Sequence, residues 1–219
     1  MSATAHSDTT SRFESLTGEV GVDFPEYAEP PLEPSGLARR WVAAAVRRGV
    51  REPLALALAT AGRDGRASTR IVAVTAVTDR GLIFTSHSSS QKGRELAATG
   101  WASGVLYWRE TGQQLIVSGP VAQLGDAESD RLWGSRPSPL HSMSTASRQS
   151  DPLRDVAALR AEAARLAATG TPLPRPARFV GYRLEYGSVE FWSASADRLH
   201  RRLRYDHDGD DWRVRRLQP

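Results

Sequence analysis

The chain has 219 residues, of which 40% are hydrophobic and 25% charged, with a formal net charge of +4 and no cysteine. This composition is that of a globular protein with one large domain or two small ones, and it excludes intrinsic disorder, disulfides and every cysteine-ligated metal site. No apolar run approaches the ~18 residues of a membrane span and the N-terminus lacks a secretory pattern, so we expect a cytoplasmic protein without a membrane partner.

The N-terminal part begins without a regular pattern. Residues 1–34 are rich in Ser, Thr, Glu and Pro and show neither helical nor strand periodicity, which predicts an extended or flexible arm. A helix is predicted over residues 37–48, where Leu37 and Trp41 open an apolar stripe at helical spacing. A single domain is therefore expected over residues 35–219.

From residue 54 the pattern becomes that of strands separated by glycine-containing turns. We expect strands over residues 54–60, 68–77 and 82–86, a short helix over 90–99, and strands over 102–108 and 114–124. Five antiparallel strands in about seventy residues favour a barrel or a sandwich over a parallel sheet.

The last third mixes helices and strands. Helices are predicted over residues 126–135 and 154–169, one long strand over 179–194, and a final hairpin with strands over 201–205 and 212–217.

Basic residues are almost all arginine, since Lys92 is the single lysine among 29 basic side chains. Most of them alternate with acids along the chain. The exception is a C-terminal cluster of arginines between residues 198 and 216, which four aspartates oppose. This mixed pattern gives little support to nucleic-acid binding, and none is expected.

Several common chemical motifs are absent from the sequence. There is no G-x-G-x-x-G, no Walker G-x-x-x-x-G-K and no G-x-S-x-G segment. The five histidines include no pair three or four residues apart, so no metal site is predicted.

The segment TSHSSSQKGREL (residues 85–96) joins a predicted strand to a predicted helix. Ser88 with Gln91 fits a capping box, so the first helical amides would face outward with a partial positive charge, an arrangement that binds phosphate. Lys92 in the first turn and Arg70 on a neighbouring strand would supply the charge to hold a dianion. The alternative is a capped surface helix with a solvated lysine.

Eight short segments resemble the pyridoxamine 5′-phosphate oxidase family in order and spacing. They are Arg70-Ile71-Val72, Ser90-Gln91-Lys92-Gly93, Gln113-Gln114, Ser135-Arg136-Pro137, Ser147-Arg148-Gln149-Ser150, Glu190-Phe191-Trp192, Arg198-Leu199-His200 and residues 212–219. The resemblance runs from residue 37 to residue 219 and is greatest to the flavin-dependent oxidases of phenazine biosynthesis, which share segments such as residues 14–18.

The resemblance implies a mainly β fold with flanking helices, the FMN-binding split β-barrel. It further implies a homodimer with one FMN in each of two clefts between the subunits, to which residues 175–219 contribute. The implied FMN contacts are Arg70, Ser86, Gln91 and Lys92 on one side and Gln114, Gln149, Ser150, Trp192 and Arg202 on the other. As alternatives, Trp192 is a core residue and Ser150 is a polar loop residue.

The sequence departs from the family where the vitamin B6 oxidases hold the substrate phosphate. The places of a lysine, a tyrosine, an arginine and a serine are taken here by Thr75, Leu132, Arg136 and Leu140. Three of the four phosphate partners are therefore absent, which makes a phosphorylated pyridoxine a poor candidate substrate.

An apolar pocket that keeps Arg136, Arg198 and His200 suits a flat ring system carrying carboxylates, with the leucines covering the rings. His141 is expected to line this pocket or to face solvent.

The predicted function is an FMN-dependent oxidase that removes hydride from a partly reduced phenazine carboxylate, a small tricyclic substrate. Dioxygen takes the electrons, which yields a more aromatic phenazine and hydrogen peroxide. Arg198 and His200 are the predicted catalytic pair, with His200 positioning the substrate more than titrating. The alternatives are a pyridoxamine or pyridoxine 5′-phosphate oxidase and a split-barrel protein that binds flavin without turnover.

Overall fold

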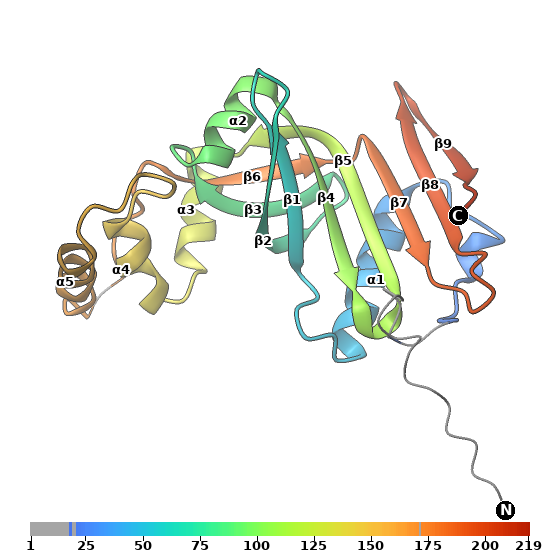
Figure 1. Cartoon of the computed structure of the whole chain (residues 1–219), viewed down its shortest axis with the longest axis horizontal. Coiled ribbons are helices and arrows are strands. Elements are labelled where there is room, and N and C mark those ends of the chain that lie inside the picture. Colours follow the sequence, from blue (N-terminus) through green and yellow to red (C-terminus); the bar gives the residue numbers. More distant parts are fainter. Residues whose placement is uncertain (1–17, 19–20, 171) are drawn as a thin grey trace, which may run out of the picture. The chain divides into compact units, whose positions relative to one another are not determined.

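The computed structural model describes residue 18, residues 21–170 and residues 172–219 (Figure 1). Within these residues the chain forms two compact units. The barrel unit contains residues 54–104 and 117–187, and the terminal unit contains residues up to 53, 105–116 and 188–219. The barrel unit lies wholly within the single domain predicted over residues 35–219, whereas the terminal unit also includes residues of the predicted arm.

The strands of the barrel unit form a closed ring. They are β1 (Ala55–Ala61), β2 (Ala67–Val77), β3 (Gly81–His87), β6 (Phe179–Glu185) and the parts of β4 (Trp101–Trp108) and β5 (Gln113–Gln123) that fall in this unit. The hydrogen-bonded order is β4-β1-β2-β3-β6-β5, and β4 also pairs with β5. Because the first and last strands of this order pair with each other, each strand has a partner on both sides.

The alternation of side chains along β1 and β2 sets the direction of Arg70. Leu58 is fully buried, and it lies opposite Arg70 in the antiparallel register. Since residues two apart share a face of a strand, Arg70 lies on the same face as the buried Val72, whereas Ile71 is 64% exposed on the other face. The guanidinium is thereby directed to the inner side of the barrel.

Four helices belong to the barrel unit: α2 (Gln91–Thr99), α3 (Asp126–Gly134), α4 (Pro139–Ala146) and α5 (Val156–Ala167). The N-cap of α2 is Ser90, whose hydroxyl accepts from the Gly93 amide at 3.2 Å. The predicted capping box of Ser88 with Gln91 is therefore wrong. Gly93 is required here, because a Cβ at this position would lie 2.3 Å from the Ser88 carbonyl oxygen.

Two further elements differ from the predictions. The short helix α4 was not predicted. The single strand expected over residues 179–194 is two strands, with a break at Tyr186 and Gly187. No helix that the structure describes has the length and apolar character of a membrane span.

The terminal unit packs around aromatic side chains. Its elements are a 3-10 turn η2 (Pro25–Tyr27), α1 (Pro34–Arg47), a 3-10 turn η3 (Arg109–Thr111), β7 (Ser188–Ser193), β8 (Arg201–Asp208) and β9 (Asp211–Arg216). The Trp41 ring lies 4.8 Å from the Phe24 ring and 5.1 Å from the Phe191 ring, both edge to face. Such contacts add to the burial of the rings and fix α1 within this unit.

Part of the predicted N-terminal arm, residues 1–17 and 19–20, lies outside the described residues. Later in the arm, Arg201 donates to the Val22 carbonyl at 2.7 Å, and Tyr205 donates to the Pro31 carbonyl at 3.1 Å. Phe24 is 2% exposed. The segment from Val22 to Pro31 is therefore held within the terminal unit, and the extended or flexible arm over residues 1–34 stays a prediction.

Candidate functional site

A cavity of about 410 Å³ in the barrel unit collects many of the predicted site residues, and we term it the Lys92 pocket. Its walls come from β2, β3, the start of α2 and the loop after α4. The predicted cofactor residues on its lining are Arg70, Ser86, Lys92, Gln149 and Ser150, and the predicted substrate residues on it are Thr75 and Arg136.

Lys92 lies in the first turn of α2, and its ammonium group is surrounded by oxygen atoms. Nζ donates to Ser86 Oγ at 3.2 Å, to Ser90 Oγ at 3.4 Å and to Gln149 Oε1 at 3.4 Å. Burial and the charge of Arg70 lower the pKa of Lys92. Among the described residues no carboxylate forms an ion pair with Lys92, so its charge is available to an anion.

Arg70 is held by a buried network that the sequence analysis missed. Its guanidinium donates to Thr60 Oγ1 and Ser68 Oγ, both at 2.5 Å, and to Glu95 Oε2 at 3.2 Å. Burial acts to raise the pKa of Glu95, but the hydrogen bonds from Thr60, Ser68, Gln91 and Arg70 outweigh it and hold the pKa at about 2. Glu95 is therefore ionised at neutral pH and fixes the direction of Arg70. The available signal was Ser68, which lies on the same strand face as Arg70.

The loop after α4 closes the pocket at the start of α2. Ser150 Oγ accepts from the Gln91 amide at 3.1 Å, and Ser86 Oγ donates to Gln149 Oε1 at 3.2 Å. Ser150 has a φ of 71°, in the left-handed region that residues with a Cβ rarely adopt. Arg178 supports the loop from behind by donating to the Ser147 carbonyl at 3.0 Å. The polar groups of this loop are thus held in place before any ligand binds.

His87 lies behind the pocket and is fully buried. Its Nδ1 accepts from the Gln149 amide at 3.5 Å, and its Nε2 is buried without a hydrogen-bond partner among the described residues. Burial, with the nearby charges of Arg178 and Lys92, lowers the pKa of His87 to about 4. The imidazole is therefore neutral at physiological pH.

Arg136 occupies the far side of the pocket. Its guanidinium lies 5.7 Å from the centre of the Phe179 ring and donates to Ser144 Oγ at 3.4 Å. Burial lowers the pKa of Arg136, and its Nε is buried without a hydrogen-bond partner among the described residues. Thr75, on the same pocket, donates its hydroxyl proton to the Ile83 carbonyl at 3.2 Å. The cation is therefore free to pair with an anion, while the threonine hydroxyl is already engaged.

The charges of the Lys92 pocket do not cancel. Arg70, Lys92 and Arg136 contribute three positive charges and Glu95 contributes one negative charge, which leaves a net charge of +2. A net charge of this size matches a phosphate dianion.

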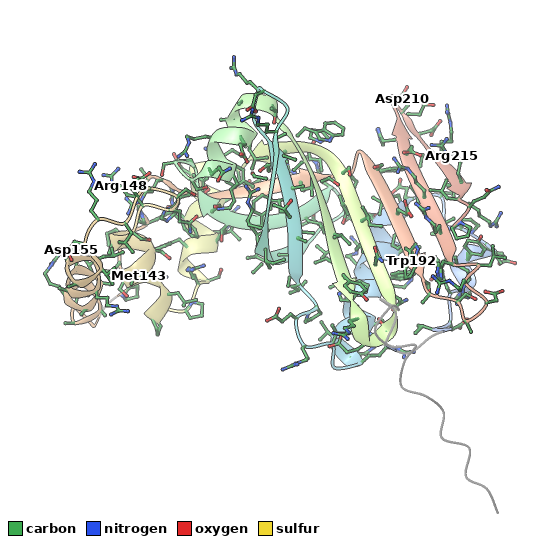
Figure 2. All side chains as sticks on the ribbon, viewed as in Figure 1. Met143, Arg148, Asp155, Trp192, Asp210 and Arg215 are labelled. Atoms are coloured by element: carbon green, nitrogen blue, oxygen red, sulfur yellow. The ribbon has the colours of Figure 1, made fainter. Side chains whose placement is uncertain are left out.

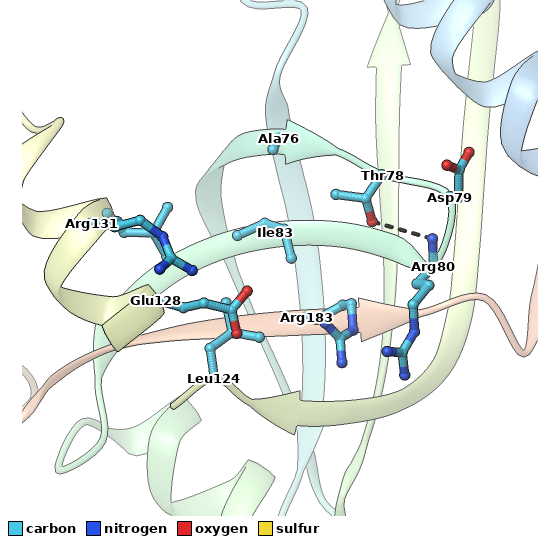
Figure 3. A pocket seen from close by; sticks show the side chains of 10 residues that line it. Ala76, Thr78, Asp79, Arg80, Ile83, Leu124, Glu128, Arg131 and Arg183 are labelled. Atoms are coloured by element: carbon cyan, nitrogen blue, oxygen red, sulfur yellow. Dashed lines mark hydrogen bonds between the residues drawn. The ribbon is translucent and has the colours of Figure 1, made fainter. Parts of the chain in front are cut away.

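A second hollow of about 400 Å³ in the barrel unit has balanced charges instead (Figure 3). Its arginines are Arg80, Arg131 and Arg183, and the carboxylates near them are Asp79, Glu128 and Glu185. This hollow therefore offers no excess charge to an anion. Leu132 lines it rather than the Lys92 pocket, and Leu140 is 47% exposed on α4.

The remaining predicted site residues belong to the terminal unit. They are Gln114 on β5, Trp192 on β7 (Figure 2), Arg198 and His200 in the β7–β8 connection, and Arg202 on β8. The Trp192 and His200 rings lie 4.8 Å apart, and Trp192 is half-buried rather than a core residue. Arg198 has a φ of 64°, and Arg202 donates to the buried Glu190 at 2.7 Å. None of them is among the described residues that line the Lys92 pocket of a single chain.

Histidines and acids do not gather into a metal site in the part of the chain that the structure describes. His141, expected to line the pocket or to face solvent, is instead buried and is not on the lining of the Lys92 pocket.

Two family models match this chain. The model described as pyridoxamine 5′-phosphate oxidase matches residues 42–170, and the model described as the pyridoxine 5′-phosphate oxidase C-terminal dimerisation region matches residues 179–219.

Individual relatives cover nearly the whole chain. The dihydrophenazinedicarboxylate synthase of Burkholderia lata is 62% identical over 96% of this chain and 99% of its own length. The dihydrophenazinedicarboxylate synthase of Pseudomonas chlororaphis is 50% identical over 94% of this chain and 93% of its own length. The crystal structure of PhzG from Burkholderia lata, in complex with tetrahydrophenazine-1-carboxylic acid, matches with a TM-score of 0.91 and 60% identity over 92% of this chain and 100% of that chain. These matches confirm the predicted mainly β split-barrel fold.

Proposed function

Because the chain belongs to the pyridoxamine 5′-phosphate oxidase family, we propose that it is an FMN-dependent oxidase of phenazine biosynthesis. Its substrate would be a partly reduced phenazine carboxylate and its electron acceptor dioxygen. The observation that carries this proposal is that the chain keeps the residues for the cofactor phosphate of the family but lacks most of those for the substrate phosphate. The Lys92 pocket keeps Lys92 and Arg70 for a cofactor phosphate, while Thr75, Leu132 and Leu140 stand where a substrate phosphate would be held.

The residues present fit FMN. Lys92 would pair with the phosphate together with Arg70, since no carboxylate competes for the ammonium group within the described chain. Ser86, Gln149 and Ser150 on the pocket lining would complete the contacts, and Gln91, which is not on the lining, would support them through its amide, which donates to Ser150 Oγ. When bound, FMN would supply the redox chemistry, namely uptake of a hydride from the substrate and transfer of its two electrons to dioxygen, which forms hydrogen peroxide.

A homodimer would complete the site. Gln114, Trp192 and Arg202 belong to the terminal unit, and the match of residues 179–219 to a dimerisation region supports assembly from two copies of the chain. The unpaired surface of β2 beside the pocket is consistent with such an interface, since Ile71 is 64% exposed.

His200 would act as a hydrogen-bond donor to the substrate. Its Nδ1 accepts from the Ser195 amide at 3.2 Å, so in the neutral ring the proton is on Nε2. A donor at Nε2 can hold a carboxylate or a ring nitrogen of the substrate, but it cannot take up a proton at that atom. In this proposal His200 positions the substrate and does not take a proton from it.

Arg136 and Arg198 would supply the charges that hold the substrate carboxylates. Arg136 is half-buried and has no carboxylate partner in the described chain, and it stands at the edge of the Lys92 pocket. Arg198 is held in the left-handed region by its local backbone, a strain that is often found at functional positions.

A pyridoxine 5′-phosphate oxidase activity is less well supported. The hydroxyl of Thr75 is used by the Ile83 carbonyl, and neither leucine can donate a hydrogen bond, so Arg136 alone would hold a substrate phosphate. Flavin binding without turnover leaves Arg198 and His200 without a role.

The experiment that tests the proposal is steady-state oxygen consumption by the FMN-loaded protein. Tetrahydrophenazine-1-carboxylic acid and pyridoxine 5′-phosphate are compared at equal concentrations. We expect hydrogen peroxide formation at a kcat/KM at least about a hundredfold higher for the phenazine, because the loss of several charged hydrogen bonds weakens phosphate binding by at least ~3 kcal/mol. The opposite preference, or no turnover of either compound, would contradict it.

A further inference from the structure

The connection between α3 and α4 carries Arg136 and is fixed by a buried histidine. His141 lies in the first turn of α4 and is 2% exposed. Its Nε2 lies 3.1 Å from both the Trp133 carbonyl oxygen and the Arg136 carbonyl oxygen. Because carbonyl oxygens only accept, the proton is on Nε2, which donates to both. The imidazole thereby fixes the backbone on which the Arg136 side chain is mounted.

A second set of contacts reaches the same guanidinium through aromatic rings. The His141 ring stacks on Trp133 with 4.0 Å between the centroids, and Trp133 meets Phe179 edge to face at 4.8 Å. Phe179 in turn lies under Arg136, at 5.7 Å. Trp133 is itself held, since its Nε1 donates to the Leu173 carbonyl at 2.6 Å. His141 therefore supports Arg136 both through its backbone and through the ring below it.

Little else directs the Arg136 side chain. Its single hydrogen bond within the described chain is the 3.4 Å contact to Ser144 Oγ, and its buried Nε has no partner there. Ser144 Oγ is also held, because it donates to the Leu140 carbonyl at 2.8 Å. Because Arg136 lines the pocket while its Nε is buried, the terminal nitrogens are the part of the guanidinium that can reach a carboxylate.

We propose that His141 is a positioning residue for substrate binding, because it fixes the place from which the Arg136 guanidinium reaches a planar carboxylate of the substrate. The proposal rests on the proposed function, since it concerns how the chain orients that substrate. His141 itself does not touch the ligand, as it is absent from the described residues that line the Lys92 pocket.

The test uses two replacements that differ in where they place an amide. Glutamine can place its amide nitrogen near the position of Nε2, whereas asparagine is too short and reaches only the position of Nδ1, which has no partner in the described chain. The apparent dissociation constant of tetrahydrophenazine-1-carboxylic acid is measured from the way the rate of flavin bleaching saturates with its concentration, in the FMN-loaded protein without oxygen. We expect His141→Asn to raise this constant about tenfold and His141→Gln to stay within about threefold of the parent chain.

A merely structural role is separated by repeating the substitution in the Arg136→Met background. If His141 acts through Arg136, adding His141→Asn to the Arg136→Met variant does not weaken substrate binding further. With or without Arg136→Met, adding His141→Asn leaves the affinity for FMN unchanged. Equal losses in both backgrounds, or equal affinities of the Asn and Gln variants, would overturn the inference while leaving the proposed function intact. A parent protein whose flavin spectrum does not respond to the carboxylate would overturn the proposed function, and this inference with it.

Discussion

Replacing Lys92 by methionine removes the ammonium group and keeps most of the length of the side chain. The three oxygen atoms that it leaves are not stranded, because Ser86 Oγ still donates to Gln149 Oε1 at 3.2 Å and lies 3.5 Å from Ser90 Oγ. The barrel should therefore stay folded, and the loss should appear in the binding of FMN.

The size of that loss follows from the charges of the pocket. The net charge falls from +2 to +1, and the Arg70 that remains is paired with Glu95 at 3.2 Å. One charge-assisted hydrogen bond contributes about 1.5–3 kcal/mol, which corresponds to a change of roughly 10- to 150-fold in a dissociation constant. We therefore expect Lys92→Met to weaken FMN binding by at least about tenfold.

The assay is a titration of the FMN-free protein with FMN, followed by the fluorescence of the flavin. The matched control is Arg94→Met, which removes a positive charge from the same helix. Arg94 is exposed, is not on the lining of the pocket, and donates to the Ser89 carbonyl. If the two variants bind FMN within about twofold of each other, Lys92 does not hold the phosphate.

Three further substitutions test the groups around the pocket. In the parent chain the pKa of His87 is about 4 in the folded state against 6.5 in the unfolded state. The contribution of His87 to the free energy of unfolding is therefore complete above pH 6.5 and falls by about 3 kcal/mol as the pH drops to 4. His87→Asn should abolish this pH-dependent loss. Urea unfolding at pH 7 and pH 4 measures it. Glu95→Gln should lower the free energy of unfolding at pH 7 by about 3 kcal/mol, because the pKa of Glu95 is about 2 in the folded state against 4.5 in the unfolded state. The ionised carboxylate therefore stabilises the fold above pH 4.5, and this contribution disappears toward pH 2. Ser150→Gly should be more stable than Ser150→Ala by about 1 kcal/mol, because only glycine relieves the φ of 71°, and thermal unfolding compares the two.

Each of these expectations has an outcome that contradicts it. If the difference in stability between pH 7 and pH 4 is the same in His87→Asn as in the parent chain, the pKa of His87 is not lowered by folding. A Glu95→Gln variant as stable as the parent chain at pH 7 would mean that the network around Arg70 does not stabilise the barrel. Equal stabilities of the two Ser150 variants would mean that the backbone there relaxes without glycine.

The strands were predictable where one face of the strand is buried. In β1 the sequence ALALATA alternates between half-buried and buried positions, and the observed strand starts within one residue of the prediction. The alternation fails at β6 and β7, where most positions on both faces are buried and one glycine, Gly187, did not identify the break. A break of this kind is decided by which neighbouring strands are available, which is a tertiary effect.

The site was predictable in its residue types but not in all of its partners. Three consecutive serines can each cap α2, and the choice of Ser90 depends on packing, because the Ser88 amide is used by the Arg178 carbonyl at 2.7 Å. The pairing of Arg70 with Glu95 joins residues 25 apart in the chain, so no local pattern reveals it. The helix α4 and its buried His141 lie in a segment without helical periodicity, and their order comes from contacts with α3 and α5.

The central claim is that this chain holds FMN in the Lys92 pocket and uses it to oxidise a reduced phenazine carboxylate. The most direct measurement is the visible absorbance of the FMN-loaded protein after tetrahydrophenazine-1-carboxylic acid is added without oxygen. The proposal predicts that the flavin band bleaches and that admitting oxygen restores it with release of hydrogen peroxide. A folded protein that does not take up FMN, or a flavin band that stays unchanged by the phenazine, would contradict it.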